Sequence, residues 1–239
     1  MTWVERTVDQ SPAMQRSRNR RIEQAKLIID AARRLIAVKG SAFTLQELAK
    51  EAEVALQTFY RYFNSKDRLL LAVIEEMISE SCQEYQERAR DLSDPIERLH
   101  FYITTTLNPS SLGGENPTGA RFVTAEHWRL HRLYPQELAQ ATKPFTDLIR
   151  GELNAAIEAG ALNPSDPESA AWLINQLVQA VFHHFAFAPD DESREGMGDR
   201  VWLFCLTALG GQAVQADRRR WLPSWRVRES DSQSTLPSP

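Results

Sequence analysis

The sequence lacks the features that would place this protein in a membrane or in an oxidising compartment. No run of about 18 apolar residues occurs, so no membrane-spanning helix and no membrane partner are expected. The first 21 residues contain no apolar core of a secretory signal. The two cysteines, Cys82 and Cys205, lie far apart and without metal-site spacing, which argues against a disulfide scaffold. We therefore expect a cytoplasmic protein.

Sequence signatures of the common enzyme classes are also missing. We find no glycine-rich phosphate loop, nucleophile elbow, metal triad or paired-carboxylate motif, so we expect no catalytic residues and no cofactor. His127 and His131 are four residues apart on a predicted helix, a spacing that can hold a metal ion. The surrounding HWRLH offers no third ligand, however, and we predict no metal site.

Patterns typical of β-strands are nearly absent, whereas apolar residues recur with the 3.6-residue period of helices. The first helix is expected to end at Gly40, and Thr44 with Glu47 forms a capping-box pattern for the next. Ser65 is expected to cap a long helix, and Pro95 suits the first turn of another. The longer predicted helices span about residues 66–90, 95–107, 118–130, 135–159, 167–187 and 199–216. We predict an all-α fold of about nine helices.

The chain has no excess of positive charge, because its formal net charge is -4. The charges are nevertheless distributed unevenly. Residues 16–68 hold twelve Lys and Arg against six Asp and Glu, whereas residues 69–239 hold fifteen against twenty-four. A basic N-terminal quarter on an acidic body is expected when one end meets an anionic partner. An accidental fluctuation is the alternative interpretation.

Residues 54–70, VALQTFYRYFNSKDRLL, crowd aromatic and basic side chains into a short segment. In a helical projection Phe59 and Phe63 are one turn apart and can pack together on Leu48 and on the apolar stripe of the first helix. The tyrosines, the threonine and the arginine then spread over the rest of the helix. Such side chains can contact phosphates and base edges in a DNA major groove. A supporting helix followed by a short helix, a turn and a second short helix makes up a helix-turn-helix motif.

The block TLQELAKEAEVALQTFYRYFNSKDRLL resembles the tetracycline-repressor-like (TetR) family of bacterial transcription regulators. The resemblance covers about residues 22–71. It is carried by the spacing of a tyrosine, a phenylalanine and a lysine, each three residues after the last, and by small and apolar residues around them. The matching residues are Thr44, Leu48, Ala49, Ala52, Val54, Thr58, Tyr60, Phe63, Lys66, Leu69 and Leu70.

The resemblance implies a division of the chain. Residues 16–65 would form a three-helix helix-turn-helix DNA-binding domain, and residues 66–221 a larger helical ligand-binding and dimerisation domain. Residues 1–15 are expected to be a disordered arm and residues 222–239 a disordered tail. The first helix is preceded by basic residues that either add phosphate or minor-groove contacts or form a frayed terminus: Arg16, Arg18, Arg20 and Arg21.

The resemblance also implies the DNA contacts. The residues expected to contact phosphates are Thr44, Thr58, Tyr60 and Lys66. Those at positions that approach bases or backbone are Gln46, Leu56, Gln57, Arg61 and Tyr62. A solvated helix face is the alternative for Gln57 and Arg61. Two positions depart from the family pattern: Glu53 stands where a turn glycine is usual and must adopt a positive φ unless the turn shifts, and Ala55 replaces a small hydroxyl cap.

The body contains material for a small-molecule cavity and a dimer surface, both of which the resemblance implies. The residues predicted to line the cavity are Phe101, Tyr102, Phe122, His127, Trp128, His131, Phe145, Trp172 and Gln176, with packing in the core as the alternative. The residues predicted at the dimer surface are Leu173, Leu177, Val181, His184, Val201, Trp202, Cys205 and Leu209. The adjacent His183 and His184 suit either a response to pH or a structural pair.

By resemblance, the protein is expected to be a ligand-responsive repressor. A homodimer would bind double-stranded DNA at a palindromic operator and would be released by a small-molecule effector. Two other functions fit parts of the sequence. A sequence-independent architectural DNA-binding protein would explain the basic quarter but not the long aromatic body. A pure ligand carrier would explain the body but not the helix-turn-helix pattern.

Overall fold

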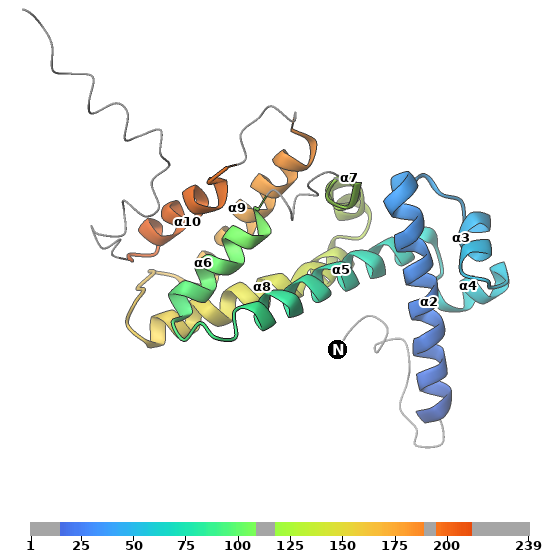
Figure 1. Ribbon diagram of the computed structural model, residues 1–239, viewed down its shortest axis with the longest axis horizontal. Coiled ribbons are helices and arrows are strands. Elements are labelled where there is room, and N and C mark those ends of the chain that lie inside the picture. The colour runs from blue at the N-terminus through green and yellow to red at the C-terminus, as the bar shows by residue number, and fades with distance from the viewer. Residues whose placement is uncertain (1–14, 109–117, 189–194, 212–239) are drawn as a thin grey trace, which may run out of the picture.

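The computed structural model describes residues 15–108, 118–188 and 195–211, and every regular element in these ranges is helical (Figure 1). This confirms the all-α prediction. The helices are α2 (Gln15–Lys39), the short 3₁₀ helix η2 (Gly40–Ala42), α3 (Leu45–Glu51), α4 (Leu56–Tyr62), α5 (Lys66–Arg88), α6 (Pro95–Thr106), α7 (Thr118–Leu133), α8 (Pro135–Glu158), α9 (Pro167–Phe187) and α10 (Met197–Ala208). No helix in the described ranges is long and apolar enough to cross a membrane.

The predicted helix starts are set by side-chain caps. The Thr44 hydroxyl accepts a hydrogen bond from the Glu47 amide, and the Glu47 carboxylate accepts one from the Thr44 amide, which completes the capping box. The Ser65 hydroxyl accepts a hydrogen bond from the amide of Arg68 and so caps α5. An aspartate followed by proline begins both α6 and α9. These local signals fixed the boundaries that the sequence predicted.

The start of the first helix and the end of the last helix differ from the predictions. Helix α2 already begins at Gln15, so the basic residues from Arg16 to Arg21 belong to a helix and not to an arm. No glycine or proline interrupts the sequence between Met14 and Lys39, which allows the helix to continue. Helix α10 ends at Ala208 and not near residue 216, because Gly210 adopts a left-handed φ of 73°. Of the arm predicted at residues 1–15, residues 1–14 lie outside the described residues, as does the tail predicted at residues 222–239.

The helices form an elongated molecule with two hydrophobic cores (Figure 1). Helices α2, α3 and α4 lie at one end, and the body of α6, α9 and α10 lies at the other. The long helices α5 and α8 run side by side and connect them. The first half of α5 packs into the core of α2–α4, and its second half packs into the core of the body. One continuous helix therefore joins the two parts of the chain.

Helix α7 also contributes to the first core. Phe122 and Leu130 of α7 are buried together with residues of α2, α4 and α5. Helix α7 contacts α2 and η2 on one side and α8 and α9 on the other. Helix α7 therefore contacts both the N-terminal helices and the helices of the body.

The inner face of α10 differs from the prediction. The predicted dimer residues Val201, Trp202, Cys205 and Leu209 are buried in the core of their own chain, where α10 packs on α6. They are therefore not available to a second subunit. The opposite face of α10 is exposed instead and carries Phe204.

Candidate DNA-recognition surface and ligand cavity

Helix α4 separates its aromatic residues between the core and the surface. The side chains of Phe59 and Phe63 are fully buried, and their rings stack with centroids 5.8 Å apart. The Tyr60 side chain between them is 49% exposed. This arrangement confirms the predicted packing of the two phenylalanines. It leaves the polar face of α4 open to solvent.

The residues predicted to contact DNA are mostly accessible on α3 and α4. Gln46, Leu56, Gln57, Tyr60 and Arg61 are exposed, and Thr58 is half-buried. Tyr62 is half-buried, and its hydroxyl donates a hydrogen bond of 2.8 Å to the Gln24 side chain of α2. The Arg61 guanidinium also reaches this oxygen, at 3.4 Å. Tyr62 thus ties α4 to its supporting helix.

The turn between α3 and α4 carries backbone strain. Glu53 adopts a φ of 53°, the left-handed conformation that the departure from glycine required. The N-cap of α4 is Ala55, which forms no side-chain cap hydrogen bond. Both predicted departures from the family pattern are therefore present in the structure.

Replacing Glu53 by glycine is expected to raise the free energy of unfolding by about 1 kcal/mol, because glycine adopts a positive φ without a Cβ clash. Equilibrium unfolding in urea, followed by circular dichroism, measures this change. The matched control is Lys50→Gly on the exposed face of α3, which should lose about 1 kcal/mol because its φ is helical. Destabilisation by Glu53→Gly would contradict the strain interpretation.

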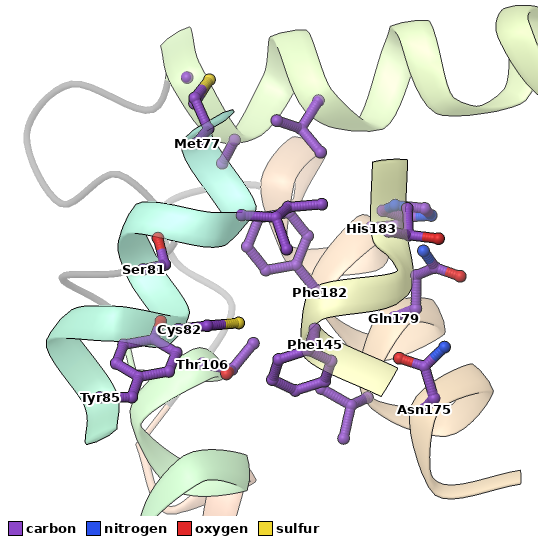
Figure 2. A pocket seen from close by; sticks show the side chains of 16 residues that line it. Met77, Ser81, Cys82, Tyr85, Thr106, Phe145, Asn175, Gln179, Phe182 and His183 are labelled. Atoms are coloured by element: carbon purple, nitrogen blue, oxygen red, sulfur yellow. The ribbon is translucent and has the colours of Figure 1, made fainter. Parts of the chain in front are cut away.

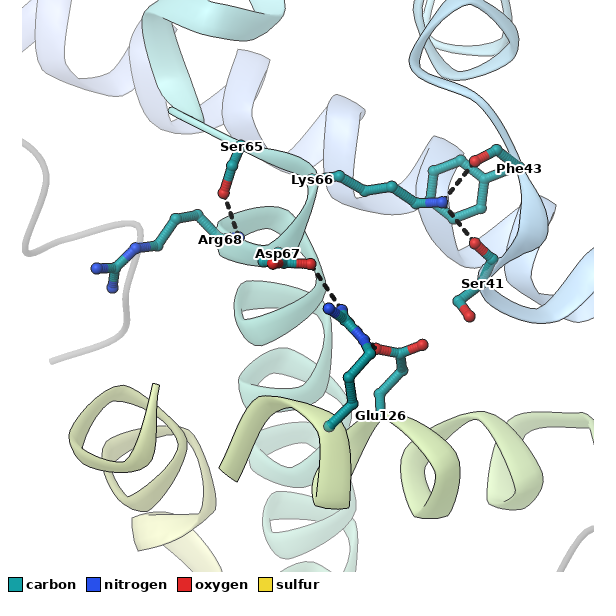
Figure 3. Close-up of polar contacts among 8 residues, drawn as sticks. Ser41, Phe43, Ser65, Lys66, Asp67, Arg68 and Glu126 are labelled. Atoms are coloured by element: carbon teal, nitrogen blue, oxygen red, sulfur yellow. Dashed lines mark hydrogen bonds and ion pairs between the residues drawn. The ribbon is translucent and has the colours of Figure 1, made fainter. Parts of the chain in front are cut away.

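Lys66 at the start of α5 binds protein carbonyls in this structure (Figure 3). Its ammonium donates hydrogen bonds to the backbone oxygens of Ser41, at 2.5 Å, and Phe43, at 2.6 Å. It also lies 4.3 Å from the centre of the Phe43 ring. Partial burial lowers the pKa of this ammonium. Lys66 therefore holds the connection between α2 and α3 against α5, a role that sequence spacing alone did not reveal. An ammonium has three donors, and the two carbonyls use two of them.

An ion-pair chain links α5 to α7 beside Lys66 (Figure 3). The Arg129 guanidinium of α7 donates hydrogen bonds of 2.7 Å to the carboxylates of Asp67 and Glu126. These bonds raise the pKa of Arg129. The Glu126 side chain is only 6% exposed, so its carboxylate meets the Arg129 guanidinium largely away from solvent. We refer to Asp67, Arg129 and Glu126 as the α5–α7 ion-pair chain.

A cavity of about 280 Å³ lies in the body, between α5, α7, α8, α9 and the end of α6 (Figure 2). Most of its walls are apolar, and its polar groups are amides, hydroxyls and one imidazole. The lining residues are Met77, Ile78, Ser81, Cys82, Tyr85, Thr106, Gly119, Ala120, Val123, Thr142, Phe145, Asn175, Val178, Gln179, Phe182 and His183. The described residues that line the cavity include no Lys, Arg, Asp or Glu.

Phe145 is the one residue of the predicted cavity set that lines this cavity. Phe101, Tyr102 and Phe122 pack in or against the two cores. Trp128, His131, Trp172 and Gln176 are exposed, with Trp128 at 65%. The lining of this cavity on α5 and α9 was not predicted, because the rotation of each helix about its axis depends on tertiary packing. The signal available in the sequence was the four-residue spacing of Asn175, Gln179 and His183 on a mainly apolar helix.

One histidine from each of the two pairs noted in the sequence, His127 and His183, lies beside the cavity. The rings of His127 and His183 lie 4.8 Å apart, and the Gln179 amide lies 3.5 Å from the His127 ring. Burial and the neighbouring imidazole lower the pKa of His183 to about 4, so this ring is neutral near pH 7. No three His, Cys, Asp or Glu side chains in the described part of the chain are grouped to hold a metal ion.

Comparison with known proteins identifies the class to which this helix-turn-helix fold belongs. Residues 28–73 match the family model described as "Bacterial regulatory proteins, tetR family". An HTH-type transcriptional regulator, Rv1255c, of Mycobacterium tuberculosis (strain ATCC 25618 / H37Rv) is 31% identical over 179 residues, which cover 72% of this chain and 79% of that relative.

Solved structures show the same fold. The transcriptional regulator FadR from Bacillus subtilis in complex with stearoyl-CoA superposes with a TM-score of 0.64 at 21% identity, covering 77% of this chain and 98% of that chain. RolR in complex with resorcinol superposes with a TM-score of 0.64 at 20% identity, covering 92% and 98%.

The fold and the exposed helix-turn-helix therefore define a DNA-binding transcription regulator. The chain belongs to the TetR family.

Proposed function

We propose that this protein is an effector-controlled repressor that binds a palindromic operator as a homodimer. The observation that carries this proposal is the coexistence of an exposed recognition helix and a small-molecule cavity joined by one continuous helix, α5. The N-terminal helices would bind the operator, and the body would bind the effector. This division corresponds to a DNA-binding domain at residues 16–65 and a body from residue 66 onward.

The DNA contacts would come from the open faces of α3 and α4. Gln46, Gln57 and Arg61 offer hydrogen-bond donors to base edges or phosphates from exposed positions, and Tyr60 offers its hydroxyl. Thr58 and the free donor of Lys66 are further candidates for phosphate contacts. Thr44 can act through its position at the α3 N-terminus, although its hydroxyl is already engaged in the capping box.

The homodimer would form through the exposed apolar side of α9 and α10. Trp172 and Leu173 of α9 are 56% and 58% exposed, and Phe204 of α10 is 66% exposed. Large exposed apolar residues of this kind mark protein interfaces. Leu177, Val181 and His184 of α9 remain candidates for the same surface. A twofold dimer would present two recognition helices to successive major grooves, roughly 34–36 Å apart.

Effector control would operate by a shift between two conformations. An effector that binds more tightly to the conformation with displaced recognition helices weakens operator binding. Helix α7 is placed to transmit the change, because it lines the cavity at Gly119, Ala120 and Val123 and reaches α5 through the α5–α7 ion-pair chain. FadR and RolR, which share the fold, were solved with stearoyl-CoA and resorcinol respectively, and this supports a small-molecule effector here.

Binding to the DNA immediately upstream of the gene for this protein and its divergent neighbour tests the proposal. Random DNA of equal length at the same salt concentration is the control, because phosphate contacts alone give little discrimination. We expect a specific, salt-sensitive complex with two subunits per palindrome. Equal affinity for both DNAs would favour an architectural DNA-binding protein, and no binding would favour a ligand carrier.

A further inference from the structure

The cavity has two chemically different walls. Met77, Ser81 and Tyr85 of α5 face it from one side (Figure 2). Asn175, Gln179 and His183 face it from α9 on the other side, one above another (Figure 2). Each is four residues from the next, so they share one face of the helix. We call these three residues the α9 polar row.

The α9 polar row can form hydrogen bonds but carries no charge. Each side-chain amide has two N–H donors and one carbonyl acceptor, and one donor of Gln179 is directed at His127 Nδ1, 3.5 Å away. The His183 imidazole is neutral near pH 7, because burial and the nearby His127 ring lower its pKa to about 4. A neutral imidazole offers one donor and one acceptor. The row can therefore recognise carbonyl, hydroxyl or amide groups, but it supplies no counter-ion.

The other polar groups of the cavity add hydrogen-bonding capacity but no charge. The hydroxyls of Thr106 and Thr142 donate to the Tyr102 and Leu138 carbonyls of their own helices, at 2.8 and 3.1 Å, so they can only accept from a ligand. No described lining residue is a lysine or an arginine. An anion held here would lose its hydration without gaining a cationic partner, which is strongly unfavourable.

We propose that the part of the effector held in this cavity is uncharged and largely apolar, and that it carries a hydrogen-bonding group recognised by the α9 polar row. This inference rests on the proposed effector control. The volume of about 280 Å³ lies just below the roughly 300–1,000 Å³ that is typical of small-molecule sites. The buried part of the effector is therefore small. Gln179 lies at the centre of the row and is the residue on which specificity depends.

A matched pair of probes tests whether the cavity prefers an uncharged ligand to an anionic one. Octanamide and octanoate have the same length and shape, but only octanoate is ionised at pH 7.5. Isothermal titration calorimetry of the full chain is expected to show at least about tenfold tighter binding of octanamide, because the carboxylate is desolvated without a partner. Two further pairs, hexanamide with hexanoate and decanamide with decanoate, test ligands shorter and longer than octanamide and so probe the size of the cavity. Equal or tighter binding of the carboxylates, or binding of neither series, would overturn the proposal.

Substitutions at Gln179 test the recognition. Gln179→Leu should weaken octanamide binding by about tenfold, because one buried hydrogen bond is lost. Gln179→Glu keeps the shape and should weaken octanoate further by like-charge repulsion. The control Gln86→Leu alters an exposed glutamine of α5 outside the cavity and should leave both affinities unchanged. Circular dichroism verifies the fold of each variant, and unchanged octanamide binding by a folded Gln179→Leu protein would contradict the assignment.

Operator binding, measured by fluorescence anisotropy on the same samples, separates this inference from the proposed function. Preferential octanamide binding by a protein that recognises no operator would uphold the cavity chemistry and reject the repressor. Operator recognition by a protein that prefers octanoate would uphold DNA binding and reject the uncharged effector.

Discussion

Replacement of Phe59 by alanine is expected to lower the free energy of unfolding by about 3–5 kcal/mol, which is typical for truncation of a buried phenylalanine. The Phe59 ring is fully buried and stacks on Phe63, and it packs in the core that α2, α3, α4 and α5 share. A loss of this size removes a large fraction of the stability of a typical domain. Urea unfolding followed by circular dichroism gives the measurement. Under the proposed function, operator binding should be lost together with the fold.

The neighbouring residue provides the matched control. Tyr60 lies on the same helix and its ring meets the Phe59 ring edge-on at 5.2 Å, but its side chain is half exposed, so Tyr60→Ala should lower the free energy of unfolding by only about 1 kcal/mol. Under the proposed function, this variant should still weaken operator binding by about tenfold through the loss of one phosphate contact. A stable Phe59→Ala protein, or an unstable Tyr60→Ala protein, would show that the two rings have been assigned to the wrong sides of α4.

Replacement of Arg129 by methionine is expected to have the second large effect, a loss of about 2–3 kcal/mol in the free energy of unfolding. The substitution leaves the carboxylate of Glu126, which is almost fully buried, without its hydrogen-bonded partner. It also removes the 2.7 Å contact with Asp67 that joins α7 to the first turn of α5. Thermal and urea unfolding measure the effect.

A double substitution identifies the cause of that loss. Glu126→Gln combined with Arg129→Met should recover most of the stability, because no charge is then buried alone. Arg132→Met, at an exposed position on the same helix, should change stability by no more than about 0.5 kcal/mol. If the double variant is as unstable as Arg129→Met alone, the loss comes from packing and not from the buried charge. Under the proposed function, the recovered variant should also show an altered operator response to effector, because α7 has lost its link to α5.

Several features of the fold could be predicted because their causes are local. Helix starts at Thr44, Ser65 and Pro167 are set by side chains within one turn of the cap, so the sequence is sufficient to locate them. The positive φ of Glu53 followed from the position of one residue in a turn. The burial of Phe59 and Phe63 followed from their spacing on a short amphipathic helix with one apolar side.

The cavity could not be located in this way. The sequence shows many aromatic residues in the body, but whether a ring fills the core or lines a cavity depends on how the surrounding helices pack. Trp128 and Trp172 are exposed, whereas Tyr102 is buried in the core. The cavity is instead lined by a mixed face of α5, from Met77 to Tyr85, and by the polar side of α9, of which only the four-residue spacing of Asn175, Gln179 and His183 left a signal in the sequence.

The sequence by itself thus determined the helices, their caps, the helix-turn-helix and its aromatic core, since each depends on interactions within a few residues. The tertiary structure alone decided the cavity lining, the partners of Lys66 and the outward face of α10. Helix α10 is apolar on both sides, with Trp202 and Phe204 only two residues apart, and hydrophobicity cannot choose between them. Packing against α6 made the choice by burying Trp202 and leaving Phe204 exposed, because the free energy of burial depends on which surfaces distant segments present to each other.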